Sequence, residues 1–422
     1  MSHHIGRVST HRSRAQRQRL GQIFVLVVAL TLIWSSGEPA TGRTAGPAFT
    51  TYLPLAATSA AGWVSSNRDW STLAANPQRT SWVAEEVRGD LGIEWYRPIE
   101  PYIPYKVQPI GANGRIYVSS ARGLYAIDAD SGALDWVYST DMPLGNSPTV
   151  TLVNGRATAY VGGYDRRVHA IDASTGLPIP SYSPYEAAAG FEANPLVIED
   201  SYTGFQPVIF AGNRDGSFYA LDAVTGAKRW SFATGGPILV SAAYKNGVIY
   251  FASNDMHAYA LTTSGALVWK SQKLPGGGFY SYWPVVYTQR ATGTDYVVFS
   301  SGSNYRFSEL GLVGQETAEF SQVISSGSLP YASGVVGDWA AGTLVMDASM
   351  LASYYENKPY RRTVLVLNAA TGQEFTFDSN GNGKAEYAPF SWSGVTVSGS
   401  KYPPVVNGVD GVYYQQTAYA DF

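Results

Sequence analysis

The sequence predicts an all-β protein, a β-propeller of about seven to eight four-stranded blades. Charged residues make up only 14% of the 422 residues and aromatic residues another 14%, which favours short packed strands over long helices, coiled coils or bulk disorder. The chain also contains repeats of 40 to 50 residues, the period of a propeller blade. Each repeat consists of short apolar segments separated by tight turns.

The repeats are recognisable because one pattern of strands and turns returns. In the first copy, alternating strands at Ile116–Ser120 and Leu124–Asp128 flank a tight turn. A further apolar segment precedes each copy after a Pro or Gly, so each period holds four strands. Since Asn368 follows Thr262 by 106 residues, we expect one degenerate blade between them, beginning near Tyr296–Ser301. The copies are Arg115–Trp136, Thr158–Pro180, Pro207–Trp230, Val248–Trp269 and the weaker Thr363–Phe377.

The last turn of each copy carries a shared signature. Ala126-x-Asp128-x-x-x-Gly132-x-x-x-Trp136 returns unbroken at Ala220–Trp230. An Asp side chain can accept hydrogen bonds from amides of its own turn, Gly permits a positive φ, and small Ala lets neighbouring sheets approach. Trp buries a large surface between blades. We therefore interpret these Asp and Trp residues as structural rather than catalytic.

This signature resembles the tryptophan-docking motif of the pyrroloquinoline-quinone (PQQ)-like propeller repeat, shared by quinoprotein alcohol dehydrogenases and non-catalytic relatives. Trp70–Trp82 also resembles the segment that precedes the first blade in that family, through Asp69, Trp70 and the N-x-Q-R-T run from Asn76. Gly92–Tyr96 resembles an outermost strand that closes the ring with the C-terminal blade. The resemblance extends from about Trp70 to the end of the chain and implies a propeller, but it does not fix the function.

The N-terminus predicts export from the cytoplasm. Basic residues from Arg7 to Arg19 precede the apolar run Ile23–Trp34, which is short for a membrane span and has the length of a signal-peptide core. We therefore assign residues 1–46 to a signal peptide and residues 47–66 to a linker, with an uncleaved N-terminal anchor as the alternative. The expected location is secreted, periplasmic or on the cell surface.

The propeller is assigned to residues 67–422. Its lead-in segment and closing strand take up residues 67–98, and its blades begin at residue 107. The stretch 306–328 breaks strand alternation and is predicted to be an insertion. Pro403–Gln416 has the pattern of only two strands of a blade, so the last blade is expected to be incomplete. Either the ring closes irregularly or the sequence is truncated.

Composition and missing motifs argue against several classes of protein. Beyond residue 46 there are 23 basic and 31 acidic residues, and this balance argues against nucleic acid as a partner. The absence of cysteine excludes disulfides, thiolate metal sites and a cysteine nucleophile. His169 and His257 are interpreted as packed or surface residues. The sequence has no G-x-S-x-G or H-E-x-x-H motif and no phosphate-binding glycine loop.

The most specific local motif is a candidate calcium loop at Asp378–Glu386. Its spacing fits D-x-[DN]-x-[DN]-G-x-x-[DE], in which alternate residues aim oxygen atoms at one point and Gly383 permits a sharp turn. With two carboxylates the site is expected to be weak and structural. The alternative is an Asn- and Gly-rich surface turn without metal. The predicted ligands are Asp378, Asn380, Asn382, the carbonyl of Lys384, and Glu386.

PQQ is not expected as a cofactor. The resemblance implies that catalytic relatives hold the quinone on the propeller axis with Ca²⁺, an Asp base and, in several classes, adjacent cysteines. This sequence has no cysteine and no convincing set of axial Glu, Asn and Asp ligands. We therefore lean towards a protein that is not an enzyme.

If the propeller binds a ligand, the pocket around its axis is the expected place. The loops that lead into each first strand face this pocket. The aromatic run Phe279–Trp283 could stack on a sugar or grip a peptide, and the alternative is that it packs on the neighbouring blade. The candidate binding residues are Asn146, Glu192, Asn194, Tyr280, Tyr282, Trp283, Lys401 and Tyr402.

The sequence therefore predicts a secreted, monomeric, non-catalytic propeller that binds a protein or a glycan on one face. Two alternatives stay open, a divergent PQQ-dependent quinoprotein dehydrogenase and a calcium-stabilised surface adhesion module. Cofactor binding and axial carboxylates would distinguish the first alternative, and an appended anchor would favour the second.

Overall fold

A computed structural model describes residues 6–7, 69–84, 92–99, 102–280, 282–302, 335–338, 343–346, 364–378, 381–387, 403–408, 411 and 413–414. The chain divides into two compact units, residues 1–62 with 91–96 and residues 63–90 with 97–422. In the first unit, β1 (Gly6–Arg7) pairs antiparallel with β2 (Trp95–Tyr96). The structure thus differs from the expected pairing of Gly92–Tyr96 with the C-terminal blade. Tyr96 is 54% exposed, and a strand without a buried face has nothing to fix its partner.

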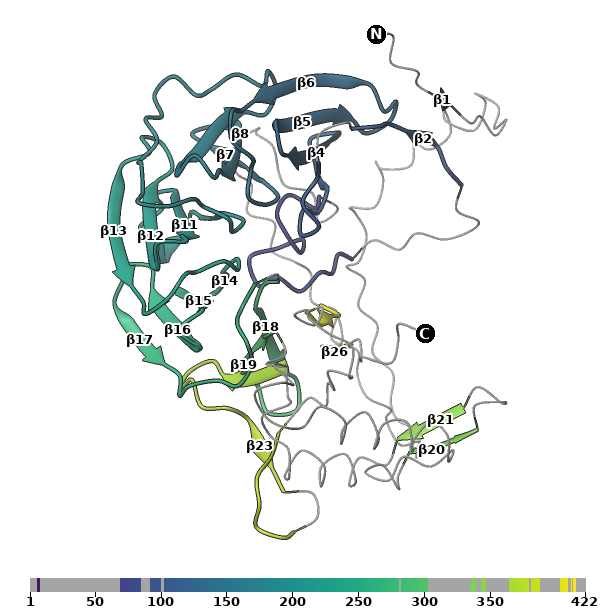
Figure 1. Ribbon diagram of the computed structural model, residues 1–422, viewed down its shortest axis with the longest axis vertical. Coiled ribbons are helices and arrows are strands. Elements are labelled where there is room, and N and C mark those ends of the chain that lie inside the picture. The colour runs from purple at the N-terminus through teal and green to yellow at the C-terminus, as the bar shows by residue number, and fades with distance from the viewer. Residues whose placement is uncertain are drawn as a thin grey trace, which may run out of the picture. The chain divides into compact units, whose positions relative to one another are not determined.

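The second unit is all-β and has the blade architecture of a β-propeller (Figure 1), as predicted. Antiparallel sheets follow one another around an arc, with the first strand of each sheet nearest the middle. The one helical piece within the described ranges is the 3-10 turn η2 (Ser201–Thr203). Blade 1 is β3 (Ile110–Ala112), β4 (Arg115–Ser120), β5 (Gly123–Asp128) and β6 (Leu134–Ser139); blade 2 is β7 (Thr149–Val153), β8 (Arg156–Gly162) and β9 (Val168–Asp172). Blade 3 is β10 (Leu196–Ile198), β11 (Val208–Gly212), β12 (Ser217–Asp222) and β13 (Lys228–Ala233); blade 4 is β14 (Ala243–Lys245), β15 (Val248–Ser253), β16 (His257–Thr262) and β17 (Leu267–Lys270).

Blade 5 corrects one expectation from the sequence. It consists of β18 (Val285–Gln289), β19 (Thr294–Ser300) and β22 (Val364–Asn368), and β19 pairs directly with β22 from Tyr296–Asn368 to Ser300–Val364. The prediction of a separate degenerate blade beginning near Tyr296 is therefore wrong, because β19 and β22 belong to one blade. The free-energy cost of closing a loop grows only slowly with its length, so two strands can pair although a long stretch of chain separates them. The spacing between the strands therefore did not reveal that they are partners.

Three further strand pairs complete the described structure. They are β20 (Val335–Asp338) with β21 (Thr343–Met346), β23 (Thr376–Phe377) with β24 (Glu386–Tyr387), and β25 (Val405–Val406) with β26 (Tyr413–Tyr414). The predicted insertion at 306–328, the signal peptide and the linker lie outside the described residues. The total of seven to eight blades stays a prediction.

The hydrophobic core lies between blades rather than within any one of them. Tyr117 and Ala126 of blade 1 are buried in one cluster with Val161 and Ile171 of blade 2. Comparable clusters join blades 2 and 3, blades 3 and 4, and blades 4 and 5. A single sheet cannot bury both of its faces, so each blade is stabilised by its neighbours.

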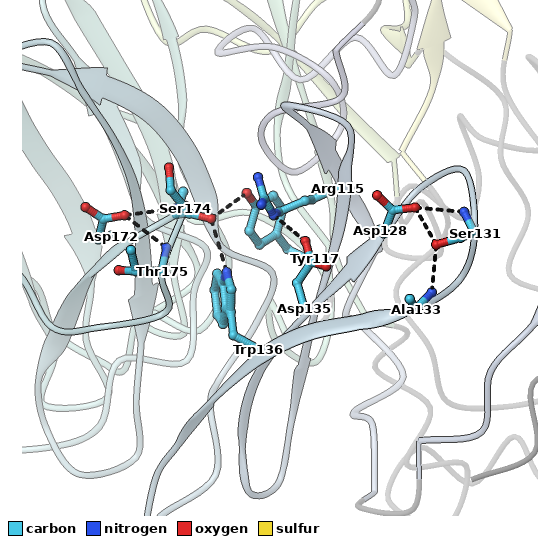
Figure 2. A network of polar contacts seen from close by, with 11 residues as sticks. Arg115, Tyr117, Asp128, Ser131, Ala133, Asp135, Trp136, Asp172, Ser174 and Thr175 are labelled. Carbon is cyan, nitrogen blue, oxygen red and sulfur yellow. Dashed lines mark hydrogen bonds and ion pairs between the residues drawn. The ribbon is translucent and has the colours of Figure 1, made fainter.

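The repeated Trp residues dock onto the next blade. Trp136 Nε1 donates a hydrogen bond to the carbonyl of Ala173 in blade 2 (3.2 Å). Figure 2 shows the Trp136 indole beside the turn that holds Asp172 and Ser174. A Cβ added at Gly176 would lie 2.6 Å from the Trp136 ring, so this position must be glycine for the ring to pack there. Trp230 and Trp269 make the same kind of bond to the carbonyls of Thr263 (3.0 Å) and Ala369 (2.8 Å). The docking motif of the sequence is thus an inter-blade contact.

The repeated Asp residues hold their own turns. Asp128 Oδ1 accepts hydrogen bonds from the amide (2.8 Å) and hydroxyl (2.6 Å) of Ser131 (Figure 2). These bonds are the main reason why the pKa of Asp128 lies below its usual value. Asp172 and Asp222 accept amide hydrogen bonds in the same way. Their geometry agrees with a structural role, as the sequence predicted.

Two ends of the blades can be told apart. At the upper end, each first strand begins and each second strand turns into the third. At the lower end, each first strand turns into the second, and the Asp–Gly turns lie there too. Across the described part of the chain, no helix is long and apolar enough to cross a membrane.

Candidate functional site

Residues 70–80 form an axial segment that crosses the middle of the blades. Its backbone carbonyls accept hydrogen bonds from the amides of the first strands of blades 1, 2, 4 and 5 and from β25. These amides would otherwise lie on open strand edges. The bonds run from Gly111 N to Trp70 O (3.1 Å), Val150 N to Ser71 O (2.8 Å), Tyr244 N to Pro77 O (2.8 Å), Val286 N to Gln78 O (3.0 Å) and Val406 N to Thr80 O (3.0 Å).

Arg79 anchors the axial segment from within. Its side chain is completely buried, and its Nε donates to the carbonyl of Ala242 (2.9 Å). Its Nη1 donates to the carbonyl of Leu73 (2.7 Å) and to the hydroxyl of Thr72 (3.0 Å). Burial lowers the pKa of Arg79 to about 9, so the guanidinium keeps its charge at neutral pH. Leu73 and Ala74 also have no exposed surface, so the chain itself fills the axis at this level.

Two predicted binding residues, Asn146 and Asn194, lie inside the protein next to this segment. Asn194 is 1% exposed; its Nδ2 donates to the carbonyl of Ser147 (2.8 Å), and its amide donates to the hydroxyl of Ser241 (2.8 Å). Asn146 is 3% exposed, and its Oδ1 accepts the amide of Ser147 (2.8 Å). The Asn194 side chain thus links the loops that lead into blades 2 and 3, whereas Asn146 bonds the residue that follows it in the same loop.

Glu192 joins two cations at the upper end. Its carboxylate accepts hydrogen bonds from Lys106 and Arg214, and Lys106 Nζ also donates to the carbonyl of Tyr280 (3.2 Å). The Lys106 and Glu192 side chains are only 6% and 10% exposed, whereas that of Arg214 is 45% exposed. The Arg214 guanidinium lies 5.8 Å from the centre of the Tyr164 ring. Two cations for one carboxylate give this cluster a net positive charge, and Arg214 presents it to solvent.

The predicted aromatic wall divides into an exposed part and a packed part. Tyr280 is 46% exposed, whereas Trp283 is 6% exposed and packs in one cluster with Leu73 and Ala74. The Tyr282 ring lies edge-on to the Trp283 ring at 5.8 Å. Trp283 therefore stabilises the axial segment, and Tyr280 faces solvent. Lys401 and Tyr402, which complete the predicted set, lie outside the described residues.

Large, exposed side chains lie at the same end of the blades as this cluster, and together with Arg214 they form what we call the upper patch. Tyr102, Tyr105 and Met142 are 68%, 70% and 47% exposed, and Tyr280 belongs to the same end of the blades. The carbonyl of Tyr102 accepts the amide of Ala121 (2.8 Å) in the turn between β4 and β5, which fixes the Tyr102 segment at the upper end. Tyr, Met and Arg are enriched in protein–protein interfaces, so the composition of the upper patch suits a protein partner.

Sequence reasoning missed a repeated brace at the upper end. Asp215 accepts the hydroxyl of Tyr219 (2.7 Å), and Asp255 accepts the hydroxyl of Tyr259 (2.5 Å). In blade 2, His169 takes the place of the tyrosine and lies 3.1 Å from Asp165. The signal was present as Asp-x-x-x-Tyr or Asp-x-x-x-His in three copies. The recurrence shows that His169 belongs to a structural brace, in agreement with its predicted packed role.

The candidate calcium loop joins β23 to β24. Asp378 Oδ1 accepts the amide of Asn382 (3.1 Å), Asp378 Oδ2 accepts the amide of Gly383 (2.8 Å), and Asn382 Oδ1 accepts the amide of Lys384 (2.8 Å). Asp378 and Asn382 thus share one hairpin tip, where their oxygens accept backbone amides of the loop. Asn380 and the side chain of Glu386 lie outside what the structure describes. Calcium binding stays a prediction.

Comparison with known proteins shows the family. A family model described as "Outer membrane protein assembly factor BamB" matches residues 79–200 and 198–374. Since these ranges make up well over half of the chain, the chain belongs to this PQQ-like propeller repeat family. The predicted resemblance is thereby confirmed.

Curated relatives and solved structures resemble parts of the chain. It is 28% identical over 182 residues to a quinohemoprotein alcohol dehydrogenase of Comamonas testosteroni, covering 38% of this chain and 25% of that protein. It is 26% identical over 286 residues to an alcohol dehydrogenase (quinone) dehydrogenase subunit of Gluconobacter oxydans, covering 59% and 34%. The chain thus spans a quarter to a third of these relatives. The crystal structure of the Comamonas enzyme (17% identity, TM-score 0.45) covers 55% of this chain and 46% of that one; that of BamB from Moraxella catarrhalis (20%, TM-score 0.34) covers 47% and 58%.

Proposed function

We propose that this protein is a non-catalytic propeller that binds a partner protein with its upper patch, outside the cytoplasm. The observation that carries the proposal is the upper patch, where Tyr102 and Tyr105 are 68% and 70% exposed at the same end of the blades as the half-exposed Arg214. The family's description as an outer membrane assembly factor supports both a protein partner and an extracytoplasmic location.

The chemistry of the upper patch supports an acidic site on the partner. Arg214 is half-exposed and is oriented by Glu192 on one side and the Tyr164 ring on the other. A guanidinium held in place loses little rotamer entropy when it binds a carboxylate. The exposed rings of Tyr102 and Tyr105 would supply apolar contact around that ion pair.

The alternative is a PQQ-dependent dehydrogenase, which the names of the curated relatives favour. Fluorescence titration of the full chain with PQQ and Ca²⁺, followed by dye reduction with alcohols and sugars, separates the two. The proposal expects no saturable quenching and no turnover. Saturable quenching with turnover would overturn it, because the two results together would show a catalytic quinone site.

A matched pair of variants tests the upper patch directly. Tyr102→Ser combined with Tyr105→Ser should abolish crosslinking to an envelope partner captured by the wild-type protein. Leu177→Ser changes a side chain that is equally exposed (64%) but lies in an Asp–Gly turn at the lower end, so it should leave crosslinking intact. Equal loss in both variants would show that the upper patch is not the binding surface.

A further inference from the structure

A second candidate site lies at the lower end, away from the upper patch. A cavity of about 540 Å³ opens there between blades 2, 3 and 4, next to the axial segment. Pro77 and Gln78 of that segment contribute to its wall, and Thr151 and Tyr244 come from the first strands of blades 2 and 4. The turn that follows β10, including Glu199, completes the lining. The cavity therefore stands on three blades that the axial segment holds together.

The charge of this cavity is negative. Glu199 is exposed, and its carboxylate makes no hydrogen bond or ion pair with any residue that the structure describes. Asp200 also lines the cavity, and its carboxylate accepts the amide of Tyr202 (2.9 Å) and the hydroxyl of Tyr244. The one lining cation is Lys245, whose ammonium already binds Asp295 (2.5 Å). Glu199 is therefore left without a counter-ion on the described surface.

Two aromatic rings stand at the same cavity. Tyr202 is 57% exposed and Phe205 is 67% exposed, and both are part of the lining. Phe205 has a φ of 56°, a left-handed conformation that is strained for a bulky residue. The turn thus holds a phenyl ring in solvent at a conformational cost. Aromatic faces beside a carboxylate attract organic cations through both the ring quadrupole and the ion pair.

We propose that this cavity binds an organic cation, a primary ammonium or guanidinium group that pairs with Glu199 and lies against Tyr202 or Phe205. The cation could belong to a basic side chain of a peptide or to a free polyamine, which share this chemistry. A neutral sugar could also contact the rings, but it would leave the Glu199 charge uncompensated. The proposal does not depend on the proposed function, since the cavity and the upper patch lie at opposite ends of the blades.

Isothermal titration calorimetry of the full chain tests this site with four probes. The probes are spermidine, an amidated Lys- and Arg-containing tetrapeptide, an acidic tetrapeptide and a neutral chitotetraose. Spermidine or the basic peptide should bind, and the one that binds more tightly identifies the source of the cation. Raising the salt concentration should weaken binding, because exposed ion pairs are screened. Binding of chitotetraose alone, or of no probe, overturns the proposal.

Variants locate the binding. Glu199→Gln keeps the shape of the side chain and should weaken cation binding about tenfold or more, as expected for a lost charge-assisted hydrogen bond. Phe205→Asn should weaken it about two- to fivefold and still fold, because Asn tolerates a positive φ. Asp130→Asn removes an exposed carboxylate from a turn of blade 1 and should have no effect. Unchanged binding in Glu199→Gln, or an equal loss in Asp130→Asn, overturns the proposal.

Discussion

Removing the Trp230 side chain tests how blades are held together. The indole packs on Gly265 of blade 4, where an added Cβ would lie 2.9 Å from the ring, and its Nε1 bonds the carbonyl of Thr263. Within blade 3 the indole lies 5.8 Å from the Phe210 ring and 6.4 Å from the Phe218 ring. Trp230→Ala therefore removes both an inter-blade contact and part of the blade 3 core.

The expected loss of unfolding free energy is about 3 kcal/mol. A fully buried Trp→Ala change costs about 3–5 kcal/mol, and Trp230 is only partly buried, which places it at the lower limit. Trp230→Phe keeps a ring but leaves the Thr263 carbonyl without its donor, so it should cost about 1 kcal/mol. Trp269→Ala should cost more than Trp230→Ala, because Trp269 is 7% exposed.

Urea unfolding followed by far-ultraviolet circular dichroism measures these changes without using tryptophan as the probe. Leu177→Ala, at a side chain that is 64% exposed, is the control and should change stability by less than about 0.5 kcal/mol. A loss below about 1 kcal/mol for Trp230→Ala would refute the docking argument.

Three other changes have expected outcomes. Arg79→Met leaves two buried carbonyls without donors and should lower the free energy of unfolding in urea by about 3 kcal/mol. A gain in stability would mean that burying the Arg79 charge costs more free energy than its hydrogen bonds contribute. Because the Ser131 hydrogen bonds lower the pKa of Asp128, the carboxylate stabilises the fold above the ordinary carboxyl pKa, and this is lost as the pH falls through the lowered value. Asp128→Asn should therefore reduce the fall in melting temperature on acidification. If the variant and the wild type lose the same melting temperature at acidic pH, this reasoning is wrong. EDTA should lower the melting temperature if the Asp378 loop binds calcium, and Asp378→Ala should abolish that response; no effect of EDTA excludes a stabilising calcium ion there.

The sequence by itself determined the blade. The periodic strands predicted the four-stranded unit, and the A-x-D-x-x-x-G-x-x-x-W signature predicted a structural turn and a docking Trp. Both are local features, since Asp128 bonds amides within its own turn and Trp136 needs only the equivalent turn of the next copy. A repeat shows such contacts in its sequence because every copy uses the same spacing.

Tertiary structure decided how the blades meet. The pairing of β19 with β22 joins strands separated by a long stretch of chain, and no spacing rule identifies such a partner. Residues 70–80 were predicted as a segment that precedes the first blade, but their axial role was missed for a similar reason. Their backbone carbonyls, which every residue has, accept hydrogen bonds from strands far along the chain. That segment holds Arg79 and Leu73 without exposed surface, and Asn146 and Asn194, which the sequence predicted to face an axial pocket, are buried as well. The two candidate binding surfaces lie at opposite ends of the blades, and only the closing of the blades around their own chain determines which side chains reach them.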